Sequence, residues 1–243
     1  RHYPAYWLRV DLAHKVVHAE LLRGIEKSGR TLTTAVETRP FEGITEITVV
    51  APDHPRLLSI IAGACTAAGG NIVDAQVFTT TDGQALDSIS ISREFNEELD
   101  EQRRGRKIGE LIEQALSGTV RLPEIVANRA QPRARQRAFT LETGIVIDNS
   151  WSNRFTVIEA SGLDRPGLLY DLTRAISDLP LHLASAHLVP FGERAVDVFY
   201  VTDLVGHKIT NPAREAAIRR RLHAAFDAAP LPDQRATRRR ETV

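Results

Sequence analysis

The sequence contains no methionine, even at position 1, and only one cysteine in 243 residues. A translation start normally supplies methionine, so we expect this chain to be a piece of a longer protein. A single cysteine excludes a disulfide framework within the chain and fits a reducing compartment, which favours a cytoplasmic location. Cys65 lies opposite Ile176 in the repeat described below, so we interpret it as a small buried side chain rather than a nucleophile.

Long apolar runs and a net charge are also missing. No stretch of 18 apolar residues occurs, and the first ten residues lack the apolar segment of a secretory signal, so we expect no membrane partner. The 31 basic residues balance 31 acidic ones, which removes the basic excess typical of nucleic-acid-binding proteins. With 42% apolar residues, the chain is long enough for two small domains that each bury a core.

The main feature that is present is an internal repeat with an offset of 111 residues. In each copy an extended apolar run ends at an aspartate, and a proline two residues later begins a helical pattern. The matched pairs include Asp53 with Asp164, Pro55 with Pro166, Leu57 with Leu168, Leu58 with Leu169, Ala64 with Ala175 and Ala75 with Ala186. A shift of one residue then aligns Asp87 with Asp197. A repeat of this length indicates a duplicated domain.

Both copies predict the element order β-α-β-β-α. The first copy has strands over 46–53, 72–79 and 86–93 and helices over 55–68 and 105–116; the second has strands over 156–164, 182–189 and 195–202 and helices over 166–178 and 212–228. The helices follow from the spacing of apolar residues, and the Asp82-Gly83 pair favours a hairpin turn in the first copy. Residues 191–193 are the corresponding turn of the second copy.

Each unit needs one more strand to become a ferredoxin-like sandwich of four antiparallel strands with helices on one face. The run 139–148 is the candidate in the first copy, after a proline- and arginine-rich stretch over 122–137. The tail of the second copy has no strand pattern. Because 32–38 precedes the first copy as 144–149 precedes the second, another hypothesis is that a strand from the front of the chain completes the second copy. The two units would then be strand-exchanged.

These patterns predict four segments. Residues 1–31 form a connector with a helix over 11–27, residues 32–150 the first unit with its flanking strands, residues 151–228 the second unit, and residues 229–243 a flexible basic tail. His14 and His18 lie four residues apart on the connector helix, but the glutamate of a zincin motif is absent between them, so we interpret them as packing or surface residues.

The repeated turn and the strand after its helix resemble the ACT domain, a small module that binds amino acids for metabolic enzymes. The strings that carry the resemblance lie at 51–55, 71–75, 78–83, 164–172 and 192–201. Together, over about residues 32–228, they are similar to the C-terminal tandem ACT region of the bifunctional uridylyltransferase/uridylyl-removing enzymes. The resemblance implies an α+β fold of two ferredoxin-like ACT domains, with the order βαββαβ and four-stranded antiparallel sheets.

The same resemblance implies a glutamine sensor of nitrogen regulation. In that bacterial family, low glutamine favours the transfer of UMP from UTP to the signalling protein PII, and high glutamine favours its hydrolytic removal. The nucleotidyltransferase needs paired metal-binding aspartates, for which Mg²⁺ is expected, and the phosphodiesterase-type hydrolase needs an adjacent His-Asp pair. This chain has no Asp-x-Asp and no His-Asp dipeptide. We therefore expect it to have no catalytic residue, metal or cofactor of its own.

The expected partners are glutamine, the missing catalytic domains and, through them, PII, and a homodimer is left open. Two other functions also remain open at this point. One is a protein-interaction module without a small-molecule ligand. The other is a tandem ACT region of a different metabolic enzyme, with a different amino acid as its ligand.

The repeated turn is the predicted ligand site. Unpaired N–H groups and the dipole at a helix N-terminus favour a carboxylate there. Asn71 offers a donor and an acceptor to an amide, and Asp53 or Asp74 would hold an ammonium group. The alternative is that Asp53 and Asp164 only cap helices. The predicted ligand-binding residues are Asp53, His54, Arg56, Leu57, Asn71, Ile72, Asp74, Asp164, Arg165, Gly167, Leu168, His182 and Leu183.

Neither copy matches the ACT pattern completely. Arg56 stands where the second copy has Gly167, so in the first copy a side chain occupies the space where backbone and ligand would approach. It would reach either the ligand carboxylate or a neighbouring surface. In the second copy His182 replaces Asn71, and the side-chain amide is lost. Each copy would therefore bind weakly, bind at a shared interface or serve structure alone.

Overall fold

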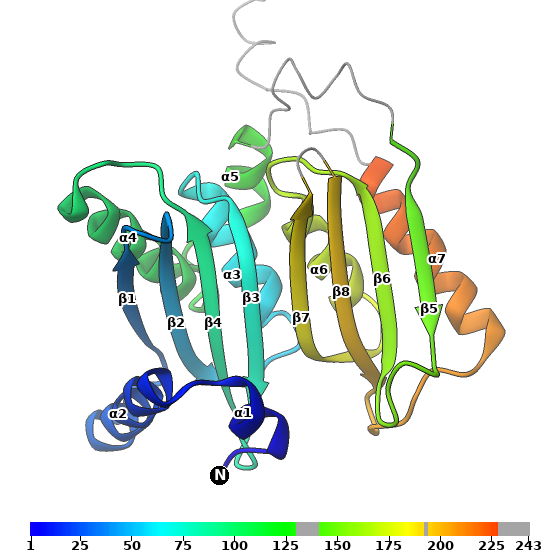
Figure 1. The fold of residues 1–243 in the computed structure, drawn as a ribbon, viewed down its shortest axis with the longest axis horizontal. Coiled ribbons are helices and arrows are strands. Elements are labelled where there is room, and N and C mark those ends of the chain that lie inside the picture. The colour runs from blue at the N-terminus through cyan, green and yellow to red at the C-terminus, as the bar shows by residue number, and fades with distance from the viewer. Residues whose placement is uncertain (130–140, 192–193, 228–243) are drawn as a thin grey trace, which may run out of the picture.

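The computed structural model describes residues 1–129, 141–191 and 194–227, which form two similar units (Figure 1). The first unit contains β1 (Thr33–Arg39), β2 (Ile44–Pro52), α3 (Leu57–Ala67), β3 (Ile72–Thr79), β4 (Gln84–Ser92) and α4 (Glu98–Leu116). The second contains β5 (Gly144–Asp148), β6 (Thr156–Leu163), α6 (Leu168–Ser177), β7 (Leu181–Phe191), β8 (Arg194–Asp203) and α7 (Pro212–Asp227). The remaining helices are α1 (Pro4–Arg9), α2 (Leu12–Ser28) and α5 (Leu122–Arg129).

Each unit has one four-stranded antiparallel sheet. The strand order is β1-β2-β4-β3 in the first sheet and β5-β6-β8-β7 in the second. The order β-α-β-β-α predicted for each copy is confirmed, and a further strand precedes it in both units. The α+β, ferredoxin-like fold class is therefore confirmed, although its fourth strand comes from the front of each unit rather than from the end.

The strand-exchange hypothesis is wrong. β1 pairs with β2 from Thr33 opposite Val50 to Arg39 opposite Ile44, and β5 pairs with β6 in the second sheet. The strand at 144–148 therefore belongs to the second unit, which begins before residue 151. A short turn that contains Gly43, with a φ of 68°, brings β1 directly back onto β2. Such a local hairpin costs less loop-closure entropy than pairing with the distant unit.

Two helical segments extend beyond the predicted elements. α4 begins seven residues before the predicted 105, at Glu98, and α5 occupies part of the stretch 122–137. The first turns of α4 are polar and gave no apolar periodicity, but Glu101 and Arg104 are buried there as an ion pair of 3.1 Å. Glu101 also accepts hydrogen bonds from the backbone N–H groups of Glu94 and Phe95. The predicted tail at 229–243, the rest of the 122–137 stretch and most of the turn at 191–193 lie outside the described residues.

Helices α1 and α2 cover the face of the first sheet opposite α3 and α4 (Figure 1). Tyr6, Val10 and Leu22 form a buried cluster there with Val50 and Leu86 of the sheet. His18 lies in the same layer, where its ring nitrogens are 3.0 Å from Tyr6 Oη and 3.3 Å from Ser88 Oγ. Burial lowers the pKa of His18 to about 4, so the ring is neutral and packs as predicted. No described helix is long and apolar enough to cross a membrane.

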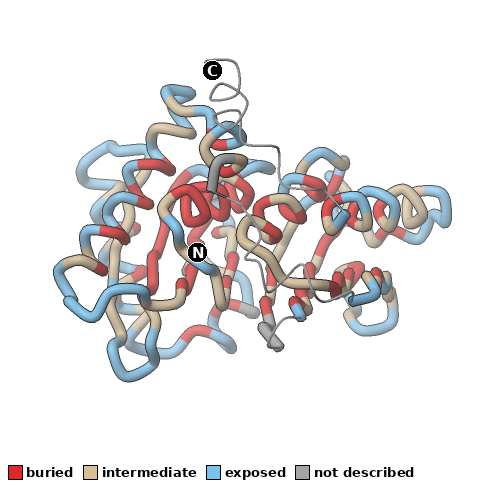
Figure 2. Tube along the Cα trace, turned by 90° about the horizontal axis from the view of Figure 1, so that it is seen from above, coloured by how far each residue is buried: buried red, intermediate tan, exposed pale blue. Residues whose placement is uncertain are grey.

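The two units pack side by side, with β3 next to β7 and α3 next to α6 (Figure 1). One core runs through both units and includes Ile61 and Ile89 in the first and Leu172 and Phe199 in the second. Figure 2 shows these buried segments inside a rim of exposed loops. Gly63 of α3 permits the close approach of α6, because a Cβ atom at this position would lie 2.9 Å from the ring of Tyr170.

We predict that Gly63→Leu weakens the interface between the two units. The added side chain meets Tyr170 and must push α6 away, so we expect the free energy of unfolding to fall by about 2 kcal/mol. Gly24→Leu is the matched control, because nothing lies within 4 Å of a Cβ atom at Gly24 on α2. This control should gain up to about 1 kcal/mol from helix propensity. Urea denaturation of both variants measures the difference, and equal stabilities would contradict the close packing of α3 on α6.

Candidate functional site

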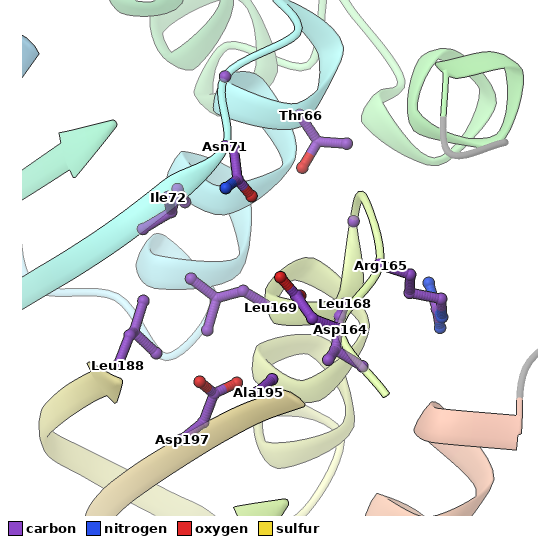
Figure 3. A pocket seen from close by; sticks show the side chains of 12 residues that line it. Thr66, Asn71, Ile72, Asp164, Arg165, Leu168, Leu169, Leu188, Ala195 and Asp197 are labelled. Atoms are coloured by element: carbon purple, nitrogen blue, oxygen red, sulfur yellow. The ribbon is translucent and has the colours of Figure 1, made fainter. Parts of the chain in front are cut away.

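A small cavity of about 40 Å³ lies where the two units meet (Figure 3). The end of α3 and the start of β3 line it from the first unit, and the turn before α6 with parts of β7 and β8 lines it from the second. Its lining residues are Thr66, Gly70, Asn71, Ile72, Asp164, Arg165, Gly167, Leu168, Leu169, Leu188, Ala195 and Asp197. This space holds only about three water molecules. A ligand of amino-acid size therefore needs the 164–169 turn to move outward.

The cavity depends on a glycine at the start of α6. Gly167 is the N-cap residue of α6 and has a φ of 82°, in the left-handed region that glycine adopts without strain. Because it has no side chain, the backbone of the turn itself lines the cavity. The N-terminus of α6, where unpaired N–H groups and the helix dipole favour an anion, therefore faces this space.

The equivalent turn of the first unit carries a side chain and contacts α6. Arg56 takes the place of Gly167 there, with an ordinary φ of −100°. Its guanidinium lies 3.8 Å from the carboxylate of Asp178 at the end of α6, and Ser177 Oγ donates a 2.9 Å hydrogen bond to the carbonyl of Pro55. Of the two predicted uses of Arg56, the structure shows the contact with a neighbouring surface.

Six of the predicted ligand-binding residues line the cavity: Asn71, Ile72, Asp164, Arg165, Gly167 and Leu168. The structure does not bring the other seven to it: Asp53, His54, Arg56, Leu57, Asp74, His182 and Leu183. Leu57 is a core residue with 2% exposure, and the ring of His54 accepts a 3.1 Å hydrogen bond from the backbone N–H of Arg56. Asp74, one of the two residues assigned to an ammonium group, lines a different cavity beneath α2.

Arg165 borders the cavity but points away from it (Figure 3). Its Nη2 atom lies 2.6 Å from Asp171 Oδ2 and donates a 2.8 Å hydrogen bond to the carbonyl of Ala225 on α7. These contacts tie the turn to α6 and α7. Arg165 therefore holds the turn in this position, and its guanidinium does not point into the cavity.

Six lining residues were not predicted, and Asp197 is the charged one among them. It lies on β8 with only 6% of its surface exposed, and its carboxylate points toward the space between Leu188 and Asp164 (Figure 3). Burial and, second, the negative charge of Asp164 raise the pKa of Asp197 to about 7. The available signal was an acidic residue at an inward-facing strand position in both copies, since Asp87 is its partner in the repeat.

The cavity offers the groups needed to bind a small zwitterion. Asn71 supplies an amide, Asp164 and Asp197 supply carboxylates, α6 supplies backbone N–H groups, and Leu169 is part of the apolar wall. Among the described residues, no three His, Cys, Asp or Glu side chains are placed to share a metal ion. The groups that line the cavity suit the binding of a small polar molecule.

Comparisons with known proteins agree with this fold. The ACT domain family matches residues 45–113, and the family described as ACR9-like, ACT-like domain matches residues 144–231. A bifunctional uridylyltransferase/uridylyl-removing enzyme of Nitrobacter hamburgensis is 61% identical over 91% of this chain and 24% of its own length. The enzyme of the same description from Rhodopseudomonas palustris is 59% identical over 96% of this chain and 26% of its own length.

The chain thus spans about a quarter of the length of the curated relatives that it matches. A solved structure, the aspartate kinase from Synechocystis, is 16% identical and covers 77% of this chain and 28% of its own, with a TM-score of 0.40.

We predict that Asp197 makes stability depend on pH. The pKa of Asp197 is about 7 in the folded state and about 4 in the unfolded state. Between these two pH values the folded state therefore binds one proton more than the unfolded state does. The free energy of unfolding therefore falls as the pH rises from 4 to 7. Asp197→Asn has no proton to lose, so we expect the slope to flatten and the variant to gain up to about 4 kcal/mol at pH 8.

Urea denaturation at a series of pH values measures this slope. Asp227→Asn is the control, since Asp227 is exposed at the end of α7 and its replacement should leave the slope unchanged. A wild-type slope in Asp197→Asn would show that other groups cause the pH dependence.

Proposed function

Since the chain belongs to the ACT domain family and corresponds to about a quarter of the bifunctional uridylyltransferase/uridylyl-removing enzymes, we propose that it is the glutamine-sensing regulatory region of such an enzyme. In this proposal the chain binds glutamine and controls catalytic domains that lie outside it. Those domains transfer UMP to PII or remove it, and they carry the Mg²⁺. The chain itself contributes no catalytic residue.

The position of Asn71 opposite the 164–169 turn carries the proposal. The side-by-side packing of β3 and β7 brings this amide from the first unit to the N-terminus of α6 in the second. An amide pairs well with another amide, because each offers one acceptor and two donors. Asn71 would therefore read the side chain of glutamine and would bind a carboxylate side chain less well.

The second unit would hold the backbone groups of the amino acid. The N–H groups at the start of α6 suit the ligand carboxylate, since the helix dipole favours an anion there. Asp164 at the same turn suits the ligand ammonium through a charge-assisted hydrogen bond. The methylene groups of the ligand would lie against Ile72 and Leu169.

A site made from both units can also transmit a signal. Binding would displace the 164–169 turn relative to β3 and would favour one arrangement of the two units over others. A coupling of about 1 to 3 kcal/mol between this change and the catalytic state changes activities several-fold or more. The ligand therefore needs only a modest difference in affinity between the two states.

A protein-interaction module is the second candidate, and one surface favours it. Trp7, Leu8, Leu12 and Val16 on α1 and α2 are 52–86% exposed, which forms an apolar strip on the outer side of these helices. Exposed apolar strips often mark contacts between domains or subunits. The catalytic domains or a second copy of the chain would be the partner.

We predict that calorimetric titration shows saturable binding that is selective for glutamine over glutamate, asparagine and serine. Asn71→Ala and Asp164→Ala should each weaken binding about tenfold or more, because each removes a hydrogen-bonding group worth about 1 to 3 kcal/mol. The matched controls are His182→Ala and Asp53→Ala, which change the equivalent positions of the repeat outside the cavity. These controls should bind glutamine like the wild type.

Three results would count against this assignment. Binding that prefers another amino acid would favour a different ACT-regulated enzyme. The absence of both heat and a thermal shift with every amino acid would favour the interaction module. Loss of binding in His182→Ala and Asp53→Ala, with binding retained in Asn71→Ala, would place the site at the equivalent positions of the repeat, outside this cavity.

A further inference from the structure

We propose that Asp197, together with Asp164, receives the ammonium group of the ligand and that each ligand binds in exchange for one proton from the carboxyl group of Asp197. The inference rests on the proposed function in one respect, namely that the ligand is an α-amino acid. It adds a residue that was not among the predicted site residues, and it predicts that the signal depends on pH.

The geometry places a carboxyl group where a cation has room to bind. Asp197 forms part of the cavity wall on β8, opposite the turn that carries Asp164, and is 6% exposed (Figure 3). No ion pair to Asp197 is present in the described part of the chain. A buried carboxylate without a cationic partner is costly, so a proton or a bound cation must neutralise it.

The charged groups around Asp197 are few. The 164–169 turn contributes Asp164 and Arg165, and the guanidinium of Arg165 is held by Asp171 and by the carbonyl of Ala225. The lining residues from α3, β3 and the loop between them are Thr66, Gly70, Asn71 and Ile72, none of which is charged. β7 contributes Leu188, which is apolar. The nearest charge is therefore the negative one of Asp164.

The exchange balances in charge. Without ligand, burial and the charge of Asp164 raise the pKa of Asp197 to about 7, so at lower pH the carboxyl group holds a proton. An arriving ammonium group supplies the same positive charge. The carboxyl proton then passes to the solvent, and an ammonium N–H donates a hydrogen bond to the resulting carboxylate.

The first unit contains an internal control for this role. Asp87 has the repeat position of Asp197, is 1% exposed, and has a raised pKa because of burial and the charge of Asp53. Asp87 does not line the cavity, and the turn beside it carries Arg56 and is held by Ser177. A purely structural role of the repeated aspartate would therefore affect both positions alike, whereas ligand binding involves only Asp197.

The test is calorimetry of the full chain with glutamine in buffers of different ionisation enthalpy. At pH 6 the observed binding enthalpy should change linearly with the ionisation enthalpy of the buffer, with a slope that corresponds to release of about one proton. At pH 8 this dependence should nearly vanish. The dissociation constant should be roughly 30-fold higher at pH 5.5 than at pH 8, because only the fraction of molecules with ionised Asp197 is competent to bind.

Two variants separate the role of Asp197 from folding. Asp197→Asn resembles the neutral carboxyl group, so it should fold and release no proton. It should bind glutamine at least about 30-fold more weakly than the wild type does at pH 8, with an affinity that does not change between pH 5.5 and 8. Asp87→Asn should keep the proton release and the pH dependence of the wild type. Glutaramic acid, which is glutamine without its α-amino group, should fail to bind the wild type.

The alternatives give different results. Glutamine binding without proton release, or wild-type binding by Asp197→Asn, would overturn the proposal and assign Asp197 a structural role like that of Asp87. Glutamine sensing would stand in that case. No binding of any amino acid at any pH would overturn glutamine sensing and this inference with it.

Discussion

The close packing of the two units along β3 with β7 and α3 with α6 is the contact on which the rest of the structure depends. It joins two small cores into one, so neither unit must bury its apolar surface alone. It also creates the cavity, whose lining comes from both units. Gly63 at the contact of α3 with α6 and Gly167 at the cavity permit this approach of one backbone to another.

The interface between the two units accounts for the fact that each copy of the repeat matches the ACT pattern only in part. The first copy has Asn71 but carries Arg56 at the turn, and the second has Gly167 but carries His182 in place of the amide. Within one copy these departures leave an incomplete site. Across the interface, Asn71 of one copy meets the glycine turn of the other. Arg56 of the first copy instead contacts Asp178 at the end of α6.

The sequence predicted most elements because apolar spacing and the repeated Asp-x-Pro turn are local signals. It did not identify the partner of each edge strand. The strands at 32–38 and 144–149 precede their copies by the same distance, and this spacing fits pairing within a unit as well as pairing between units. The polar start of α4 was missed because its burial depends on the Glu101–Arg104 pair. Six residues of the cavity were predicted, whereas Asp197 was not. Only the packing of the two units shows that Asp197, and not its repeat partner Asp87, lines the cavity.

Hydrogen exchange of the full chain with and without glutamine tests most directly whether one site is shared by the two units. The account predicts that glutamine slows exchange of backbone amides in two segments together, 70–72 at the start of β3 and 164–169 at the start of α6. Exchange in 53–58 and 182–183, the equivalent segments outside the cavity, should not change. Protection confined to one unit, or protection of 53–58 with 182–183, would contradict the shared site.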